Sequence, residues 1–351
     1  MIIKVIDPSE DKRWDNFIYN HPEGTIFHTS NWARVIQKTY GYIPYYFILI
    51  EEADQKVAGG CPFFLIKNYL TGNRLVCLPF TDNCFPLFNQ STNIDFIFFP
   101  IVKMMKQRKL DNIEIRGEMA DSLKKFNFNK HNYYKLFRLD ISIGLDNLWK
   151  EFKQKSIRYP IRKAQNSGII IEKSVSEEIL KSFYRLNILT RRKHGIIPQP
   201  YKFFLHIQQE IFNRNLGFLL IARYKNIVIA GSLFFIYKNT IYYKFNASHI
   251  NYLKFQPNHL ILWEAIKWAV ENDYKIFDLG RTSPDNPGLM ALKRHWGTEE
   301  IDLPYYYWPE IRGTSATKES SLRYRIVSSV LKKTSIPLLK IAGNLFYKHL
   351  G

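Results

Sequence analysis

The sequence predicts an α/β (α+β) fold of two tandem domains, each a mixed β-sheet flanked by helices. Its 351 residues exceed the usual size of one hydrophobic core, and its two halves repeat one order of predicted strands and helices. The 46% hydrophobic and 16% aromatic content is typical of folded domains. We therefore expect an N-terminal domain at 1–143, a C-terminal domain at 144–313 and a tail at 314–351.

In the first half, apolar runs and alternating patterns predict the sheet. Ile113 and Ile115 alternate with Glu114 and Arg116, which is the pattern of a half-buried strand. The predicted order is strands at 56–67 and 74–79, a helix at 95–107 that contains Pro100, a strand at 111–116, a short helix at 120–126 and a closing strand at 133–141.

The second half repeats that order with stronger signals. Apolar residues recur at helical spacing from 258 to 271, which predicts an amphipathic helix. Around it we expect strands at 217–223, 227–237, 240–245 and 275–279, then a helix at 288–295 and a strand at 305–308. Between the halves, residues 145–165 are predicted to be helical, with an interruption at Pro160.

Composition excludes several classes of protein. No apolar run approaches the roughly 20 residues that span a bilayer, and the first residues lack the pattern of a signal peptide, so we expect a cytoplasmic protein. Cys61, Cys77 and Cys84 have no zinc-ligand spacing, which predicts reduced thiols and no metal site. The net charge of +19 predicts an anionic partner, whether RNA, membrane phospholipid or a phosphate-bearing substrate.

The segment at 274–297, YKIFDLGRTSPDNPGLMALKRHWG, predicts a strand, a polar loop and a short helix that carries a cation. Acyl transfer passes through an oxyanion, which a fixed cation stabilises. Lys293 is the first candidate for that cation, and a solvated helix residue is the alternative. Arg281 follows Gly280 at the strand end and suits a phosphate or carboxylate. Asp278 is a candidate general base, or else it caps backbone amides.

FDLGR at 277–281 and LKRHWG at 292–297 resemble the signature of FemAB-related acyltransferases, which belong to the GNAT-like superfamily. Tyr159-Pro160 and Phe85 depart from the family's usual residues. The resemblance implies tandem GNAT-like domains and places the lysine at 293 on the donor side of the reaction. Other segments that resemble family elements are FHTSNW at 27–32, LPFTDNCFPLF at 78–88, IRKAQNSGIIIEK at 161–173 and TRRKHGIIPQP at 190–200.

Two basic clusters suit a diphosphate-linked acceptor or a nucleic-acid backbone. A solvated face and complementarity to a helix dipole are the respective alternatives. His194 precedes Gly195, a predicted C-cap, and is therefore given a positional role. The first cluster is Lys155, Arg158, Arg162 and Lys163; the second is Arg191, Arg192, Lys193 and His194.

Four further residues are candidates for substrate contacts. Tyr243 and Asn246 lie on a predicted strand of the second domain, where they line the site or belong to the core. His28 and Asp82, in the matched segments of the first domain, are candidates for contacts with the acceptor.

The donor is predicted from a missing loop. Acetyl-CoA users of the GNAT type carry a glycine-rich turn before a helix, whereas residues 253–259, LKFQPNH, contain no glycine. This weakens the case for an acyl-CoA donor and, with the resemblance, favours aminoacyl-tRNA as the donor.

We expect transfer of an aminoacyl or acyl group to an amine of an anionic cell-envelope precursor, with no permanently bound cofactor. A CoA-dependent N-acyltransferase acting on a polysaccharide or lipid-linked sugar and a non-catalytic RNA- or membrane-binding scaffold are the alternatives.

The tail has a character of its own. Beyond Pro337 an apolar stripe of Leu338, Ile341, Leu345 and Phe346 accompanies lysines, which predicts a basic amphipathic helix. Residues 321–350 are therefore expected to contact an anionic membrane surface, with peripheral attachment to the inner face of the plasma membrane. Docking on the protein's own core is the alternative.

Overall fold

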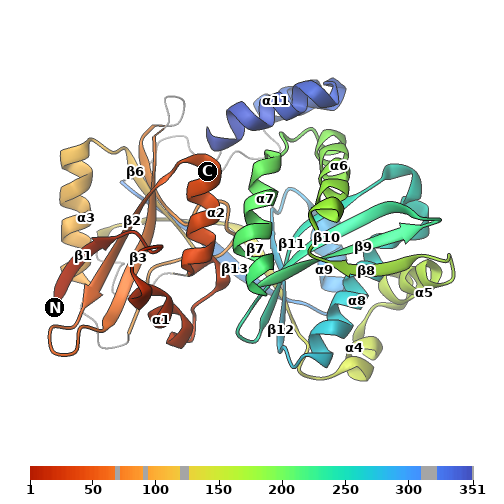
Figure 1. The fold of residues 1–351 in the computed structure, drawn as a ribbon, viewed down its shortest axis with the longest axis horizontal. Coiled ribbons are helices and arrows are strands. Elements are labelled where there is room, and N and C mark those ends of the chain that lie inside the picture. The colour runs from red at the N-terminus through yellow and green to blue at the C-terminus, as the bar shows by residue number, and fades with distance from the viewer. Residues whose placement is uncertain (68–71, 90–93, 119–125, 310–321, 350–351) are drawn as a thin grey trace. The chain divides into compact units, whose positions relative to one another are not determined.

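The computed structural model describes residues 1–67, 72–89, 94–118, 126–309 and 322–349 (Figure 1). The chain divides into two compact units. Unit 1 comprises Met1–Tyr133, Leu303–Thr314 and Lys348–Gly351, and unit 2 comprises Tyr134–Asp302 and Ser315–Tyr347. Each unit contains a mixed sheet flanked by helices, which confirms the predicted fold class.

Unit 1 contains the strand order β1-β2-β3-β4-β6-β13, with β5 paired to β3 and with β4 and β6 parallel. Helix α2 begins after Thr29, whose hydroxyl accepts from Trp32 N, and ends at Gly41 in the left-handed conformation. The elements are β1 (Ile2–Ile6), α1 (Lys12–Asn20), η1 (Ile26–His28), α2 (Ser30–Tyr40), β2 (Ile43–Ile50), β3 (Val57–Ile66), β4 (Arg74–Cys77), β5 (Leu87–Phe88), α3 (Asp95–Arg108) and β6 (Asn112–Arg116).

Unit 2 contains the strand order β8-β9-β10-β11-β12-β7, with β11 and β12 parallel. Its elements are β7 (Asn129–Asp140, shared with unit 1), α4 (Leu145–Glu151), the π-helical turn η3 (Gln154–Arg158), α5 (Tyr159–Gln165), β8 (Ile170–Ser174), α6 (Glu177–His194), α7 (Tyr201–Glu210), η4 (Phe212–Arg214), β9 (Gly217–Tyr224), β10 (Ile227–Tyr237), β11 (Thr240–Ser248), η5 (Ile250–Phe255), α8 (Pro257–Glu271), β12 (Ile276–Thr282), α9 (Pro287–His295) and β13 (Glu299–Trp308, shared with unit 1).

The closing strand of each unit comes from a part of the chain that the sequence analysis assigned to the other domain. Residues 135–140 of β7 pair with β12 in unit 2, and residues 305–308 of β13 pair with β6 in unit 1. The boundary between the two compact units therefore falls between Tyr133 and Tyr134, whereas the sequence analysis placed it between 143 and 144. Residues 303–314 belong to unit 1. A hydrophobic pattern identifies a strand but not the sheet that it joins.

Two local predictions also need correction. Strand β6 is buried at all five positions, although it was predicted to be half-buried. It tolerates this because Glu114 and Arg116 form an ion pair with each other. The predicted helix at 145–165 breaks at Phe152, ahead of η3, and Pro160 instead lies in the first turn of α5, where its missing N–H is harmless. The short helix predicted at 120–126 lies almost wholly outside the described residues.

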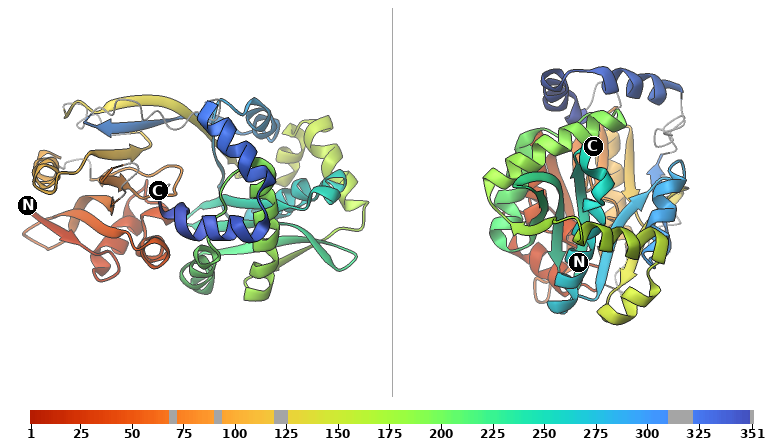
Figure 2. Two further views of the ribbon diagram at one scale, coloured as in Figure 1. Left: turned by 90° about the horizontal axis from the view of Figure 1, so that it is seen from above. Right: turned by 90° about the vertical axis from the view of Figure 1, so that its right-hand side faces the viewer.

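The tail forms helices α10 (Leu322–Lys333) and α11 (Ile336–Phe346), followed by the short turn η6 (Tyr347–His349). Both helices pack against α6 of unit 2 (Figures 1 and 2). The Ser328 hydroxyl donates to the His194 carbonyl at 3.2 Å. The tail is thus docked on its own unit through one face. Among the described helices, none has the length and apolar character needed to cross a bilayer.

Candidate active site

The candidate site of unit 2 begins where two parallel strands stop pairing. Strands β11 and β12 pair from Thr240–Ile276 to Tyr242–Asp278, after which β11 runs on to Ser248 and β12 to Thr282. On its other side, β12 has a bulge between Asp278 and Arg281, where two residues face Phe137 of β7. Bulges of this kind re-aim side chains and are common beside active sites.

The bulge explains why the sequence reads Asp-Leu-Gly-Arg. Gly280 adopts a φ of 72°, a conformation that side-chain-bearing residues rarely take. The Asp278 carboxylate accepts from Gly280 N at 2.7 Å and pairs with Arg138 Nε at 3.2 Å. Asp278 is buried and makes the backbone-amide contact of the capping alternative, while its role as a general base stays a prediction.

Lys293 reaches the same bulge from α9. Its side chain is 6% exposed, and Nζ donates to the Gly280 carbonyl at 2.9 Å and to the Arg281 carbonyl at 3.2 Å. The ammonium also lies 5.1 Å from the centroid of the Phe137 ring. Lys293 is therefore not the solvated helix residue of the alternative reading; it is a buried cation fixed at the end of β12.

Two predicted anion-binding residues from distant segments share one neighbour. The Arg281 guanidinium lies over the Tyr134 ring at 4.3 Å. Arg281 from β12 and Arg191 from the end of α6 both act electrostatically on Tyr347 of η6. Burial raises the pKa of Tyr347, while the two arginines and a hydrogen bond with Gln199 oppose that increase. Arg191 and Arg281 thus both lower the pKa of one tail residue.

Comparisons with known proteins match the part of the chain that carries this site. A family model described as an acetyltransferase (GNAT) domain matches residues 152–294, a segment that ends just after Lys293. The lipid II:glycine glycyltransferase of Staphylococcus haemolyticus is 38% identical over 86 residues, which cover 22% of this chain and 20% of that protein. The chain is FemAB-related and GNAT-like.

Solved structures show that this FemAB-related chain has the tandem GNAT-like fold. The crystal structure of FemX superimposes with a TM-score of 0.69 at 18% identity, covering 87% of this chain and 97% of FemX. A tandem GNAT protein from the clavulanic acid biosynthesis pathway gives a TM-score of 0.57 at 8% identity, covering 87% and 97% of the two chains. The match to the glycyltransferase spans only about a fifth of that relative's length.

The FemAB-related chain has a polar network along β11. Asn246 Nδ2 donates to Ser232 Oγ at 3.1 Å and to Asn258 Oδ1 at 3.2 Å, and Asn258 in turn contacts Ser248. The Tyr243 hydroxyl bonds with Ser232 and Asn246, and burial raises its pKa to about 12. Tyr243 and Asn246 are half-buried members of this network, so their substrate contact stays a prediction.

Where a glycine-rich turn would hold a pyrophosphate, this chain has the 3₁₀ turn η5. Gln256 follows it with a φ of 61°, and Pro257 opens α8. The chain therefore enters α8 through a turn that contains no glycine.

The two basic clusters have different surroundings. Arg162 and Lys163 are exposed on α5, with the Arg162 guanidinium 5.6 Å from the Trp149 ring, and Arg158 is half-buried. Arg191 and Arg192 lie at the end of α6, which Gly195 terminates as predicted. Figures 1 and 2 show α5 on a different side of unit 2 from the tail that covers α6.

His194 is the last residue of α6, directly before the C-cap Gly195, and its positional role stays a prediction. Its carbonyl accepts from Ser328 of the tail. Partial burial lowers the pKa of His194, and the neighbouring cations Lys193, Arg191 and Lys332 lower it further. The end of α6 is therefore a region of positive potential that includes a tail lysine.

In unit 1 the two candidate residues of the matched segments, His28 and Asp82, differ in exposure. His28 is fully buried; its Nδ1 bonds with Thr25, and its Nε2 lies 3.0 Å from the Phe85 carbonyl and 3.3 Å from Cys84 Sγ. The structure gives His28 this packing role in place of the predicted acceptor contact, because no ring atom reaches the surface. Asp82 is half-buried, and its acceptor contact stays a prediction.

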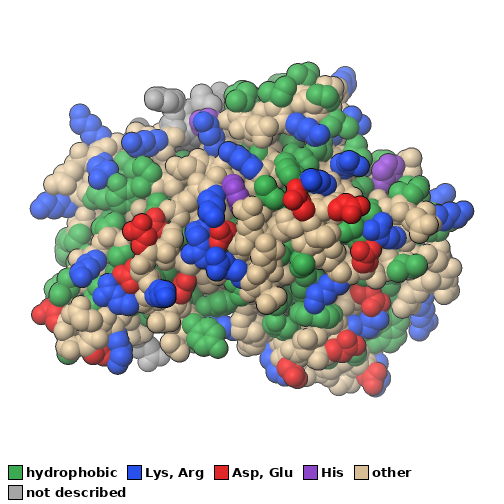
Figure 3. Space-filling view, in the orientation of Figure 1, with side chains coloured by type: hydrophobic (Ala, Val, Ile, Leu, Met, Phe, Trp, Pro, Cys, Tyr) green, Lys and Arg blue, Asp and Glu red, His purple; other side chains and the backbone are tan. Residues whose placement is uncertain are grey.

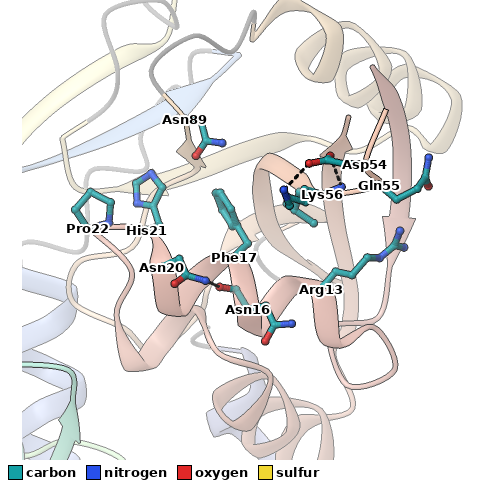
Figure 4. Close-up of a pocket in the computed structure, with 11 residues that line it drawn as sticks. Arg13, Asn16, Phe17, Asn20, His21, Pro22, Asp54, Gln55, Lys56 and Asn89 are labelled. Atoms are coloured by element: carbon teal, nitrogen blue, oxygen red, sulfur yellow. Dashed lines mark hydrogen bonds and ion pairs between the residues drawn. The ribbon is translucent and has the colours of Figure 1, made fainter. Parts of the chain in front are cut away.

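Unit 1 also contains a pocket of about 620 Å³ between α1 and the β2–β3 turn (Figure 4). Phe17 and His21 line it, as does Asn89, and Figure 4 shows Lys56 paired with Asp54 at its rim. None of the predicted site residues contributes to its lining. Its cations Arg13 and Lys56 already have carboxylate partners, so it gives no clear anion site.

Sequence reasoning missed three residues of the site. Arg138 pairs with Asp278, Tyr134 underlies Arg281, and Tyr347 is under the electrostatic influence of Arg191 and Arg281. The first two are on β7, which was assigned to the other domain. The tail was treated as a separate segment, so no local pattern linked Tyr347 to the site.

Proposed function

We propose that this FemAB-related protein is an acyltransferase that moves an aminoacyl group from charged tRNA to an amine of an anionic cell-envelope precursor of the peptidoglycan type. The carrying observation is the buried cation Lys293, which holds the Gly280 and Arg281 carbonyls at the bulge of β12. Arg281 emerges from that same bulge and, with Arg191, suits the phosphates of an anionic acceptor. The segment shared with a lipid II:glycine glycyltransferase supports this substrate class.

The proposed reaction is aminolysis of an ester. The acceptor nitrogen, as a neutral amine, attacks the carbonyl carbon of the aminoacyl ester, so that a C–N bond forms and the C–O bond to the tRNA ribose breaks. The nitrogen loses one proton as the amide forms, and the departing ribose oxygen gains one. Between these events the former carbonyl oxygen carries negative charge, which a fixed cation stabilises.

Each remaining residue has a proposed role in this scheme. Lys293 supplies positive charge at the strand end, and Asp278 positions Gly280 through its amide contact. Arg192 and His194 add positive potential beside Arg191. Arg158, Arg162 and Lys163 on α5 suit the backbone of the donor tRNA, whose phosphates attract exposed cations. Tyr243, Asn246 and Asp82 are proposed to contact the substrates.

The donor distinguishes this proposal from its main alternative, an acyl-CoA-dependent N-acyltransferase that modifies a polysaccharide or lipid-linked sugar. The family model described as an acetyltransferase domain favours that alternative, whereas η5 in place of a glycine-rich turn favours tRNA. Isothermal titration of the protein with acetyl-CoA and, separately, with charged tRNA should show binding of the tRNA only.

The location follows from the acceptor. We propose that the protein acts in the cytoplasm, at the inner face of the plasma membrane, because a lipid-linked precursor is presented there. Residues 321–350 of the tail are the proposed point of contact with the anionic surface.

A transfer assay tests the proposed function. Purified protein is incubated with charged tRNA and a lipid-linked peptidoglycan precursor, and the precursor is analysed by mass spectrometry. The expected product is heavier by one aminoacyl residue. An acyl product formed only with acyl-CoA would establish the alternative, and binding of both ligands without any product would identify a non-catalytic scaffold.

A further inference from the structure

The outer face of the docked tail exposes aliphatic and aromatic side chains. Seven large apolar residues of α10 and α11 are between 51% and 62% exposed. By contrast, Ser328, Leu339 and Gly343 are buried where the helices meet unit 2. The exposed residues, called here the tail face, are Ile326, Val327, Val330, Leu338, Ile341, Leu345 and Phe346.

Helical spacing puts most of the tail face on the side away from the protein. In α11, Leu338, Ile341 and Leu345 follow an i, i+3, i+7 pattern and form one stripe, while Leu339 and Gly343 form another. In α10, Ile326 and Val330 are one turn apart and lie opposite Ser328. Both helices thus follow one plan, with small or buried residues inward and large apolar residues outward.

The docking contact leaves little freedom to turn that stripe inward. A Cβ at Gly343 would lie 2.5 Å from the Pro198 carbonyl oxygen, so the α11 backbone rests directly on the loop after α6. Gly195 makes the same close approach to Ser328 of α10. The tail face is therefore a fixed outer surface of unit 2.

The charged side chains of the two tail helices have one sign. Lys332, Lys333 and Lys340 are exposed on the same two helices, and the sequence from 322 to 349 contains no aspartate or glutamate. In Figure 3, hydrophobic surface lies beside Lys and Arg side chains along the edge occupied by α11. What covers this face must accept apolar side chains and cations together.

Three kinds of partner can be weighed by that chemistry. A second copy of the chain would bring lysines against lysines, which is repulsive. The phosphate backbone of RNA would pair with the cations but offers no apolar surface for the aliphatic side chains between them. An anionic bilayer satisfies both, because acyl chains receive the apolar residues and headgroup phosphates receive the lysines.

We infer that the tail face is a monotopic docking surface for an anionic phospholipid bilayer. The buried stripe fixes the tail to α6, and the exposed stripe inserts at the level of the headgroups with its lysines among the phosphates. In terms of the proposed function, on which this part rests, docking holds the Arg191 end of α6 near a lipid-linked acceptor. The membrane contact itself is independent of the reaction.

Vesicle flotation of the full-length protein tests this inference. We expect flotation with vesicles of phosphatidylcholine and phosphatidylglycerol, weakened by salt, and little flotation with phosphatidylcholine alone. Ile341→Gln combined with Leu345→Gln should lower the partition coefficient at least about tenfold. The matched control, Ile170→Gln with Ile227→Gln, alters exposed aliphatic residues of β8 and β10 and should change nothing. Circular dichroism checks that each variant is folded.

A charge variant separates the two contributions. Lys332→Gln, Lys333→Gln and Lys340→Gln together should weaken binding to the anionic vesicles roughly a hundredfold. Equal binding of the wild type to neutral vesicles, or no binding to anionic ones, would overturn the inference. Concentration-dependent dimerisation lost in Ile341→Gln with Leu345→Gln would assign the face to a second copy. RNA binding lost in the charge variant, without vesicle binding, would assign it to RNA.

The outcome can be separated from the proposed function. Transfer to a water-soluble fragment of the acceptor should be unchanged in Ile341→Gln with Leu345→Gln, while transfer to the acceptor in vesicles should fall. Conversely, Arg281→Gln should still float with anionic vesicles. Flotation by a protein that transfers nothing would support the docking surface and refute only the activity.

Discussion

The parallel strand pairs of the two units carry an acidic residue at the same place in the ladder but use it differently. In unit 1 the third pair is Val76–Glu114, and in unit 2 it is Tyr242–Asp278. Glu114 is bound by Arg116, two residues further along its own strand. Asp278 is instead bound by Arg138 from β7 and by the amide of Gly280.

This difference decides what happens to the arginine at each strand end. In unit 1, the backbones of Cys84 and Arg116 form an isolated antiparallel β-bridge. The buried Arg116 side chain donates hydrogen bonds to the Glu114 carboxylate and to the Thr81 carbonyl. Burial alone would lower the pKa of Arg116, but the Glu114 carboxylate raises it above its usual range. In unit 2 the acid is already satisfied, and Arg281 lies over Tyr134, beside the bulge that Lys293 holds. The same fold thus gives a self-neutralised strand end in one unit and a cationic one in the other.

The largest expected effect is on the stability of unit 1. Glu114→Gln leaves Arg116 and Arg74 without their buried carboxylate and should lower the free energy of unfolding by about 3–5 kcal/mol. Chemical denaturation measures it. The control, Glu172→Gln, removes a more exposed partner of Arg223 and should cost less than about 1 kcal/mol. If folded Glu114→Gln protein transferred less per molecule than the wild type, the assignment of the chemistry to unit 2 alone would be contradicted.

Histidines give a second contrast, this time in pH dependence. His28 of unit 1 has hydrogen-bond partners for both ring nitrogens, whereas His259 Nε2 is buried without one among the described contacts. Burial lowers the pKa of His259 to about 4, against 6.5 when unfolded. Between these values the unfolded chain binds the extra proton, so stability falls as pH decreases.

His259→Asn should reduce that acid-induced loss by roughly 2 kcal/mol. The measurement is urea denaturation of both proteins at neutral pH and again near the lower end of this interval. If the wild type and His259→Asn lose the same free energy of unfolding between the two pH values, His259 is not the group responsible for the loss.

The arginine pair of unit 2 should affect binding of the acceptor. Arg281→Gln or Arg191→Gln each removes a charged contact with the anionic group and should raise the KM for the acceptor about tenfold, with a smaller change in kcat. Arg162→Gln, on exposed α5, serves as the control for acceptor binding. A KM that stays constant in both variants would move the acceptor's anionic group away from the end of β12.

The smallest expected effect on stability comes from replacing a glycine at positive φ. Each unit contains such a glycine with nearly the same φ, so the two substitutions can be compared directly. Gly280 at 72° lies in the bulge, and Gly41 at 70° terminates α2 in unit 1. Alanine at either position should lower stability by about 1 kcal/mol, because both backbones disfavour a Cβ. Only Gly280→Ala should also slow transfer, since its carbonyl is held by Lys293. Equal activity of the two variants would argue that bulge geometry is unimportant.

Much of this arrangement was predictable from local patterns. Strands β9 to β12 and helices α8 and α9 fall within a few residues of their predicted positions, because their periodicity and turn residues are strong. The family resemblance and the GNAT-like fold were confirmed by the comparisons. The sequence could identify the FDLGR and LKRHWG motifs but not how they are connected. In the structure, Lys293 of the second motif donates hydrogen bonds to the Gly280 and Arg281 carbonyls of the first.

What the sequence could not supply was long-range pairing. Arg138 and Tyr134 reach the site because β7 joins the sheet of unit 2, and that choice depends on tertiary packing. His28 was misassigned because its partners, Phe85 and Cys84, lie 57 and 56 residues away. Tyr347 joins Arg191 and Arg281 only because the tail folds back on α6.

Turnover of Lys293→Met in the tRNA-dependent transfer assay tests the central claim, that unit 2 performs the chemistry with a buried cation, most directly. Methionine keeps the side chain's volume and removes its charge, so we predict a fall in kcat of at least about a hundredfold. Folding, measured by circular dichroism and thermal melting, should be retained, with partial recovery in Lys293→Arg. A Lys293→Met protein that transfers aminoacyl groups within twofold of the wild-type rate would contradict the account.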